Sequence, residues 1–168
     1  MSKRIQASIF LSLISLVLFF GLFATTATPA AASLRQIEEA PGQILYQSRQ
    51  TLPDKSGNAW QVVFFKQTKT GQPSTINLRL VGFPGASEFV HPKDLTIKIR
   101  PGITLIAADV FVEKSPAPNV GQYDFSNLVK QWQENNFWEL ELPLQRKDKI
   151  ELLIPYFVIQ EWQSVAAS

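Results

Sequence analysis

The chain contains a single histidine, His91, and this is the first residue to consider for chemistry. An imidazole can act as a general base when a carboxylate orients it and a hydroxyl lies within reach. The carboxylates considered as its partner are Asp94, Asp109 and Asp124. A serine would supply the nucleophile, but no Gly-x-Ser-x-Gly turn of the kind that exposes such a serine occurs. His91 is therefore the catalytic candidate, and an ordinary loop residue is the alternative.

Residues that bind metal ions are scarce. One histidine and no cysteine argue against a zinc or copper site, because these sites usually take two or more such ligands. No Asp-x-Asp-x-Asp-Gly loop is present for calcium. Glu139 and Glu141 lie two residues apart, which places both on one face of a strand and is typical of a solvated face. Paired carboxylates of glycosidases instead lie across a cleft from each other. We predict no metal and no cofactor.

Two glycine-containing loops are the best candidates for binding, Gly82-Phe-Pro-Gly85 and Asn119-Val-Gly-Gln-Tyr-Asp124. Glycine permits backbone conformations that other residues avoid, and exposed loops often carry function. The candidate binding residues are Phe83, Gly85, Asn119, Gly121 and Tyr123. The alternative is that both segments are tight turns with anchoring aromatic side chains.

The N-terminal segment predicts export. Lys3 and Arg4 precede an apolar run from 9 to 23, and small residues follow up to Ala32. These are the three parts of a secretory signal peptide, which we expect to be cleaved. The alternative is an uncleaved membrane anchor, in which case this segment would contact the membrane. The mixed basic pair favours the general secretory route, and the absence of cysteine excludes lipid attachment at the cleavage point. We therefore expect a signal peptide over 1–32 and one domain over 33–168.

Charge and motifs argue against nucleotides and nucleic acids. The whole chain has 16 basic and 14 acidic residues, a net charge of +2. Removal of Lys3 and Arg4 leaves 14 of each sign and a net charge of 0. No glycine-rich phosphate loop and no interleaving of basic and aromatic residues is present.

Most of the domain alternates apolar and polar residues with the period of a β-strand. The expected strands are 44–52, 59–66, 75–81, 95–100, 103–112, 138–142 and 149–154. Asp124 is a suitable N-cap for a helix, and Phe125, Leu128, Val129 and Trp132 form one apolar stripe at helical spacing.

The segment 156–162 is either a last strand or a short terminal helix, and we expect a strand. The fold class that follows is mainly β: an antiparallel sandwich or partly open barrel of seven to eight strands, with one amphipathic helix over about 125–135.

Several segments together resemble a known family. They are Pro41-Gly-Gln-Ile-Leu-Tyr-Gln-Ser-Arg-Gln50, Leu78-Arg-Leu-Val-Gly-Phe-Pro-Gly85, Asn119-Val-Gly-Gln-Tyr-Asp124 and Phe157-Val-Ile-Gln-Glu-Trp-Gln163. With the N-terminal signal, the chain resembles an uncharacterised family of exported cyanobacterial proteins that is defined as a domain of unknown function. The resemblance implies export to the periplasm or the thylakoid lumen. It implies no activity and no functional residue.

These observations favour a non-enzymatic function. We expect an exported binding or assembly protein with an unknown protein partner. One alternative is a carrier of a small apolar ligand, with a barrel cavity lined by Trp60, Phe64, Trp138 and Phe157. The other alternative is a hydrolase that uses His91.

Overall fold

The structure is a computed structural model that describes residues 35–99, 102–113, 115–132, 137–145 and 149–168. The predicted signal peptide lies outside these residues. Residues 32–168 form one compact unit. In the part of the chain that the structure describes, no helix combines the length and the apolar character needed to cross a membrane.

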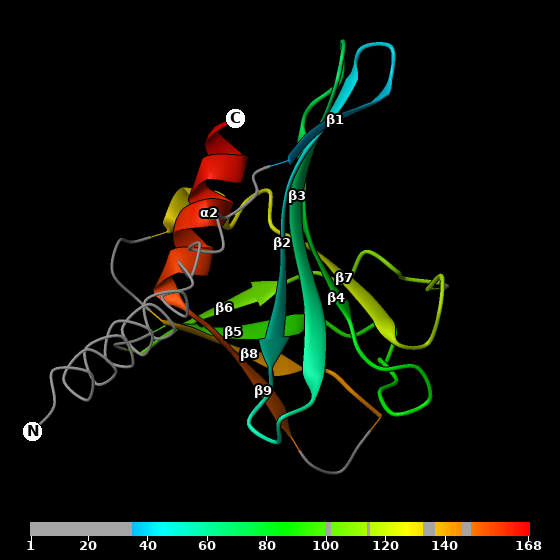
Figure 1. The fold of residues 1–168 in the computed structure, drawn as a ribbon, viewed down its shortest axis with the longest axis vertical. Helices are drawn as coiled ribbons and strands as arrows, with labels where there is room; N and C mark the ends of the chain where they lie inside the picture. Colours follow the sequence, from blue (N-terminus) through cyan, green and yellow to red (C-terminus); the bar gives the residue numbers. More distant parts are fainter. Residues whose placement is uncertain (1–34, 100–101, 114, 133–136, 146–148) are drawn as a thin grey trace, which may run out of the picture. The chain divides into compact units, whose positions relative to one another are not determined.

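A five-stranded antiparallel sheet is the larger of two sheets (Figure 1). Its order is β1-β2-β3-β4-β7. The strands are β1 (Arg35–Ala40), β2 (Gln43–Pro53), β3 (Ala59–Lys69), β4 (Thr75–Val81) and β7 (Val120–Asp124). Strands β2 and β3 pair along their whole length, from Gln43 opposite Lys69 to Pro53 opposite Ala59. This hairpin forms the centre of the sheet.

The second sheet has four antiparallel strands in the order β6-β5-β8-β9. They are β5 (Leu95–Ile99), β6 (Ile103–Ala107), β8 (Trp138–Leu142) and β9 (Ile150–Ile154). Alternate residues of β5, β8 and β9 are buried, as the sequence pattern predicts. The inner faces of the two sheets share one apolar core.

The predicted fold class is confirmed as mainly β: the described residues form two antiparallel sheets that fit a sandwich, and these strands do not close into a barrel. The described residues form nine strands, more than predicted. The additional strands are β1, in a segment for which no strand was predicted, and β7, in a segment expected to be a loop. Both lie at the edges of the larger sheet.

The predicted strand over 156–162 is wrong, because this segment belongs to helix α2 (Tyr156–Ala167). The helix follows Pro155, whose fixed φ suits the residue that precedes a helix. Its buried residues are Val158, Ile159, Trp162 and Val165. They share one helical face, which packs on the inner side of β2 and β3 (Figure 1). The aromatic and β-branched residues at the start of this segment favour a strand locally, but burial of the apolar face against the sheet decides for a helix.

The predicted helix over about 125–135 is also wrong for the residues that the structure describes. Asp124 ends strand β7, and its carboxylate accepts a hydrogen bond from the Ser126 backbone N–H at 2.8 Å. A turn follows, and then the short 3-10 helix η1 (Val129–Gln131). Residues 133–136 lie outside the described residues. Phe125 and Leu128 are buried, so the apolar stripe reflects packing into the core without an α-helix.

Aromatic side chains fill the space between α2 and the two sheets. Phe64 stacks on Trp162 with the ring centres 4.9 Å apart, and Trp138 meets Trp162 edge to face at 6.1 Å. Trp60 is buried and packs against Phe89. Phe157 is instead 54% exposed on α2. The four residues proposed to line a carrier cavity therefore do not surround one space.

Candidate functional site

The only histidine forms a pair with a buried carboxylate. His91 Nδ1 lies 2.6 Å from Asp109 Oδ2, and the Asp109 side chain is 1% exposed. The same carboxylate accepts hydrogen bonds from the backbone N–H groups of Lys93 and Phe111, at 3.2 and 2.9 Å. Asp109 is thus the one of the three candidate carboxylates that orients His91. Asp94 accepts a hydrogen bond from the Asp109 backbone N–H.

The pair lacks the other parts of a hydrolytic site. The second ring nitrogen of His91 is buried and has no hydrogen-bond partner among the described residues. The ring packs against Phe89 and Phe111, with centres 6.3 and 5.9 Å away. Within the described part of the chain, no serine hydroxyl is bonded to it. The geometry therefore favours a structural clamp between residues 91–93 and 109–111.

Tyr123 and Gly121 belong to the core and are unavailable to a ligand in this structure. Tyr123 is 0% exposed, and its hydroxyl has no partner within the described residues. Burial, together with the carboxylates of Asp109 and Asp94, raises the pKa of the Tyr123 hydroxyl far above its ordinary value. A Cβ on Gly121 would lie 2.7 Å from the Tyr123 hydroxyl oxygen. Glycine is needed here to admit that hydroxyl.

The remaining loop candidates are joined by hydrogen bonds. The Asn119 amide donates to the Gly82 carbonyl at 2.8 Å, and the Gly82 N–H donates to the Asn119 carbonyl at 3.0 Å. Phe83 is 71% exposed beside this junction, and Gly85 has a positive φ of 77° in the following turn. The structure thus brings the two predicted loops together, with Phe83 as the side chain that projects from them.

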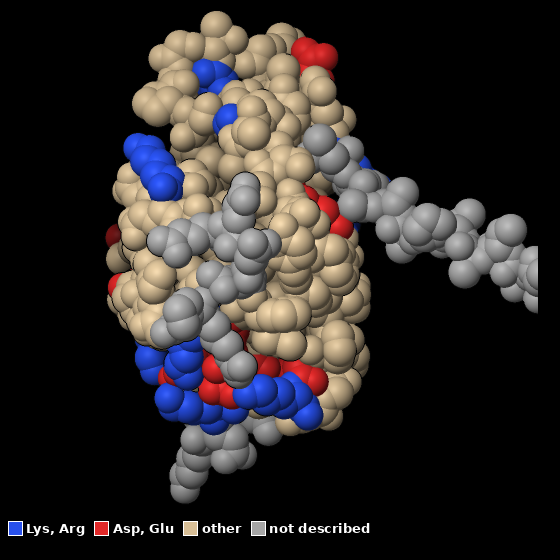
Figure 2. Space-filling view, turned by 90° about the vertical axis from the view of Figure 1, so that its left-hand side faces the viewer, with Lys and Arg blue, Asp and Glu red and all other residues tan. Residues whose placement is uncertain are grey.

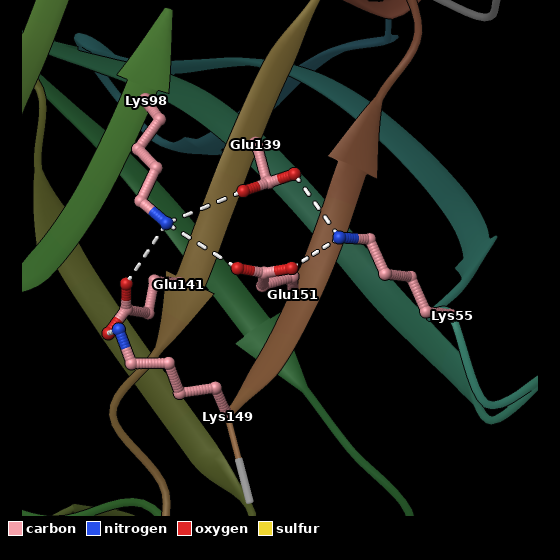
Figure 3. Close-up of polar contacts among 6 residues, drawn as sticks. All are labelled: Lys55, Lys98, Glu139, Glu141, Lys149 and Glu151. Atoms are coloured by element: carbon pink, nitrogen blue, oxygen red, sulfur yellow. Dashed lines mark hydrogen bonds and ion pairs between the residues drawn. The ribbon is translucent and has the colours of Figure 1, made fainter.

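Glu139 and Glu141 lie on the outer face of the four-stranded sheet, in a network with three lysines and one further glutamate. Figure 3 shows Lys98 facing Glu139, Glu141 and Glu151; its Nζ lies 3.3 to 3.5 Å from one carboxylate oxygen of each. Lys55 pairs with Glu139 and Glu151, and Lys149 pairs with Glu141 at 2.8 Å. Figure 2 shows basic and acidic atoms intermingled in one patch at the lower end of its view.

Charges in this network balance each other. The hydrogen bond from Lys149 is the main cause that lowers the pKa of Glu141, and the hydrogen bond from Lys55 has the same effect on Glu151. Carboxylates held ionised in this way are poor general acids. In the chain as far as it is described, no group of three His, Cys, Asp or Glu residues is arranged to hold a metal ion. The network therefore has a structural role, in which the ion pairs of Lys55 link the β2–β3 turn to the second sheet.

A groove on the outer face of the five-stranded sheet is the feature best suited to binding. It has a volume of about 580 Å³ and lies on the side of the sheet away from the core. The outward-facing side chains of β2, β3, β4 and β7 form its floor. These are Leu45, Gln47, Arg49, Gln61, Val63, Phe65, Gln67, Asn77, Arg79, Val81, Val120 and Gln122, with Ile37, Glu39 and Pro116 at the rim.

Three amide side chains in this groove are buried: Gln47 at 6% exposed, Asn77 at 9% and Gln122 at 7%. The amides of Gln47 and Asn77 form no hydrogen bond with any described residue. The amide atoms themselves are not fully buried, so they remain open to water or to a ligand from the groove. They can therefore donate hydrogen bonds to a bound molecule and accept hydrogen bonds from it.

Two arginines in the groove have no carboxylate partner among the described residues, Arg49 and Arg79. Arg79 Nε and Nη2 donate to Gln122 Oε1 at 2.9 and 2.6 Å. The Arg79 guanidinium also lies over the Phe65 ring, 5.5 Å from its centre. These contacts fix the orientation of Arg79 before any ligand arrives.

Of the groove residues, only Val120 and Gln122 belong to a segment that the sequence analysis named as a candidate for binding, the loop 119–124, and neither was among the candidate binding residues. The available signal is the run of Gln, Asn and Arg at the outward positions of strands, where Thr or Lys would serve solubility equally well. Single strands do not show that these positions meet. The register does, because Val63 lies opposite Arg49 on one side and opposite Arg79 on the other.

Comparison with known proteins identifies a family for this chain but no activity. The model of a family described as "Protein of unknown function (DUF3122)" matches residues 32–165. No curated protein sequence and no solved structure gives a significant match to the chain.

Proposed function

We propose that this chain, which belongs to the DUF3122 family of proteins of unknown function, is a binding protein that holds its ligand on the outer face of the five-stranded sheet. The observation that carries the proposal is the set of amide side chains and of arginines without a carboxylate partner among the described residues, all in one groove. Amide and guanidinium groups that line one groove and are not used up by neighbouring side chains can form hydrogen bonds with a ligand.

We further propose that binding occurs outside the cytoplasm, in the periplasm or the thylakoid lumen. The basic, apolar and small-residue parts of segment 1–32 support this location. The proposal includes a role in accessory or assembly processes, because such a role requires binding and no catalytic group.

Side-chain NMR signals test the proposal directly. The full chain, labelled with nitrogen-15, would be titrated with size-fractionated extract from the exported compartment. We expect the side-chain amide signals of Gln47, Asn77 and Gln122 to shift. The amide of Asn58, which is bonded to Asp54 in the β2–β3 turn, is the internal control and should not move. Shifts confined to residues outside the groove would contradict the proposed binding face.

A further inference from the structure

We infer that the ligand of this groove is an anionic polysaccharide, whose carboxylate or sulfate groups bind Arg49 and Arg79. The inference rests on the proposed function and names the class of ligand. It depends on the placement of charge in the groove, on the orientation of Arg79 and on the kind of polar groups around them.

The positive charges stand in one row across the sheet. Arg49 and Arg79 both lie opposite Val63, one on each side, so their backbones are about 10 Å apart, which is two strand spacings. The only acidic residue that lines the described groove is Glu39, and its carboxylate accepts hydrogen bonds from Gln43 and Gln67 at 2.8 and 2.7 Å. Gln67 lies four residues along β3 from Val63, about 13 Å away. The row is therefore positive and is not neutralised from within.

Arg79 is prepared to bind an oxyanion. Two of its five N–H groups point at Gln122, which leaves three for a ligand. Phe65 supports the plane of the guanidinium from one side. A fork held in this way matches the two oxygens of a carboxylate or a sulfate, and it loses little side-chain entropy on binding.

The surroundings of the arginines favour a sugar chain over an acidic peptide. The groove offers the amides of Gln47, Gln61 and Asn77, and each amide both donates and accepts hydrogen bonds, as a sugar hydroxyl does. An extended peptide typically binds by adding a strand to the edge of a sheet. This groove lies on the face, where the backbone groups of β2, β3 and β4 already pair with their neighbours. Only side chains are therefore offered to the ligand.

The groove also has the length for a chain molecule. Its lining extends from Ile37 on β1 to Gln122 on β7, across all five strands. Four strand spacings correspond to about 19 Å. A single small anion would leave most of the amides without partners.

Calorimetric titration of the full chain tests the class of ligand. The probes are oligomers of galacturonate, a sulfated glucan, a neutral glucan and polyglutamate. We expect binding of the galacturonate or the sulfated oligomer, which identifies the anionic group, and at least tenfold weaker binding of the neutral glucan. Binding should weaken as salt rises, because the contacts are exposed ion pairs.

Variants connect the binding to the arginine row. Arg79→Gln removes the fork, and Gln122→Glu places a competing carboxylate beside it. Each should weaken binding of the anionic oligomer by about 10- to 100-fold, as expected for a hydrogen-bonded ion pair. Lys130→Gln removes one positive charge from the exposed side chain in η1 and should change affinity less than twofold. Thermal melting of each variant confirms that it folds.

The outcomes separate this inference from the proposed function. Equal binding of neutral and anionic glucans, or unchanged affinity in Arg79→Gln, would overturn the role of charge. Tighter binding of polyglutamate than of either anionic sugar would overturn the sugar class. If no probe binds while extract still shifts the groove amides, the ligand class is wrong and the proposed function stands. If neither probes nor extract act on the groove, both fail.

Discussion

Asp54 organises the turn between the two central strands, and its replacement by alanine gives a quantitative test of the fold. Its carboxylate accepts hydrogen bonds from the backbone N–H groups of Ser56 and Asn58 at 2.8 and 2.9 Å. It also accepts from the Asn58 amide and, at 3.1 Å, from Trp60 Nε1. Trp60 is 1% exposed, so removal of Asp54 leaves the buried Trp60 N–H without its acceptor.

The expected loss follows from these contacts. An unpaired, buried indole N–H costs about 1–3 kcal/mol. The N–H groups of Ser56 and Asn58 lie in an exposed turn where water replaces the carboxylate, so each adds roughly 0.5 kcal/mol. Asp54→Ala should therefore lower the free energy of unfolding by about 2–4 kcal/mol. Total stabilities of single domains are about 5–15 kcal/mol, so the change is large.

The effect should depend on pH with a defined sign. Burial by itself raises the pKa of Asp54, but the hydrogen bonds from Asn58, Trp60 and Ser56 outweigh it and hold the pKa below its ordinary value. A carboxyl with a lowered pKa in the folded state contributes its stability above the unfolded pKa of about 3.9. That contribution disappears as the pH falls through the folded value. The difference between wild type and Asp54→Ala should therefore narrow below about pH 4.

Urea unfolding at several pH values, followed by tryptophan fluorescence, measures this difference. Glu88→Ala is the control, because Glu88 is exposed and its side chain makes no hydrogen bond with a described residue. It should change stability by less than about 0.5 kcal/mol. In a Trp60→Phe background, Asp54→Ala should lower the free energy of unfolding by at least about 1 kcal/mol less than in wild type, because the indole N–H is absent. Equal costs in both backgrounds would refute the reasoning.

Three further substitutions test other contacts. Lys98→Met removes the lysine that contacts three glutamates, including Glu141, and should cost about 0.5–1 kcal/mol at low salt and less in 1 M salt in urea titrations. Gly121→Ala forces a methyl group against the Tyr123 hydroxyl and should cost about 1–3 kcal/mol by thermal denaturation; an unchanged melting temperature would contradict the packing. Glu161→Ala leaves the buried hydroxyl of Ser48, bonded at 2.6 Å, without its acceptor. Relative to wild type, the substitution should speed amide hydrogen exchange in α2 more than in β3, which would show that this contact holds the helix.

Alternation in the sequence predicts the strands well because it reports burial of one face. The strands at Thr75–Val81 and Trp138–Leu142 have the predicted bounds. The same signal fails where burial is irregular. Phe125 and Trp132 both pack against Phe64, but they reach it from a turn and from the end of a 3-10 helix. Their spacing resembles a helical stripe although no α-helix carries them.

The site could be predicted only in part. His91 and Asp109 are identifiable as a possible pair, but only the fold shows that the second ring nitrogen of His91 is buried among aromatic rings. The groove depends on which residues of four strands stand side by side. Arg79 meets Gln122 because β7 pairs with β4, a pairing across more than 40 residues that no local pattern reveals.

In the five-stranded sheet, alternate positions of the same strands face the core and the groove. Along β3, Val62 and Phe64 serve the core, while Gln61, Val63 and Phe65 line the groove. Mutations that retune recognition and mutations that disturb folding therefore fall on interleaved positions. Exchange of every second residue along these strands would change the groove and leave the core positions as they are. A library that randomises only the groove positions should accordingly yield mostly folded proteins.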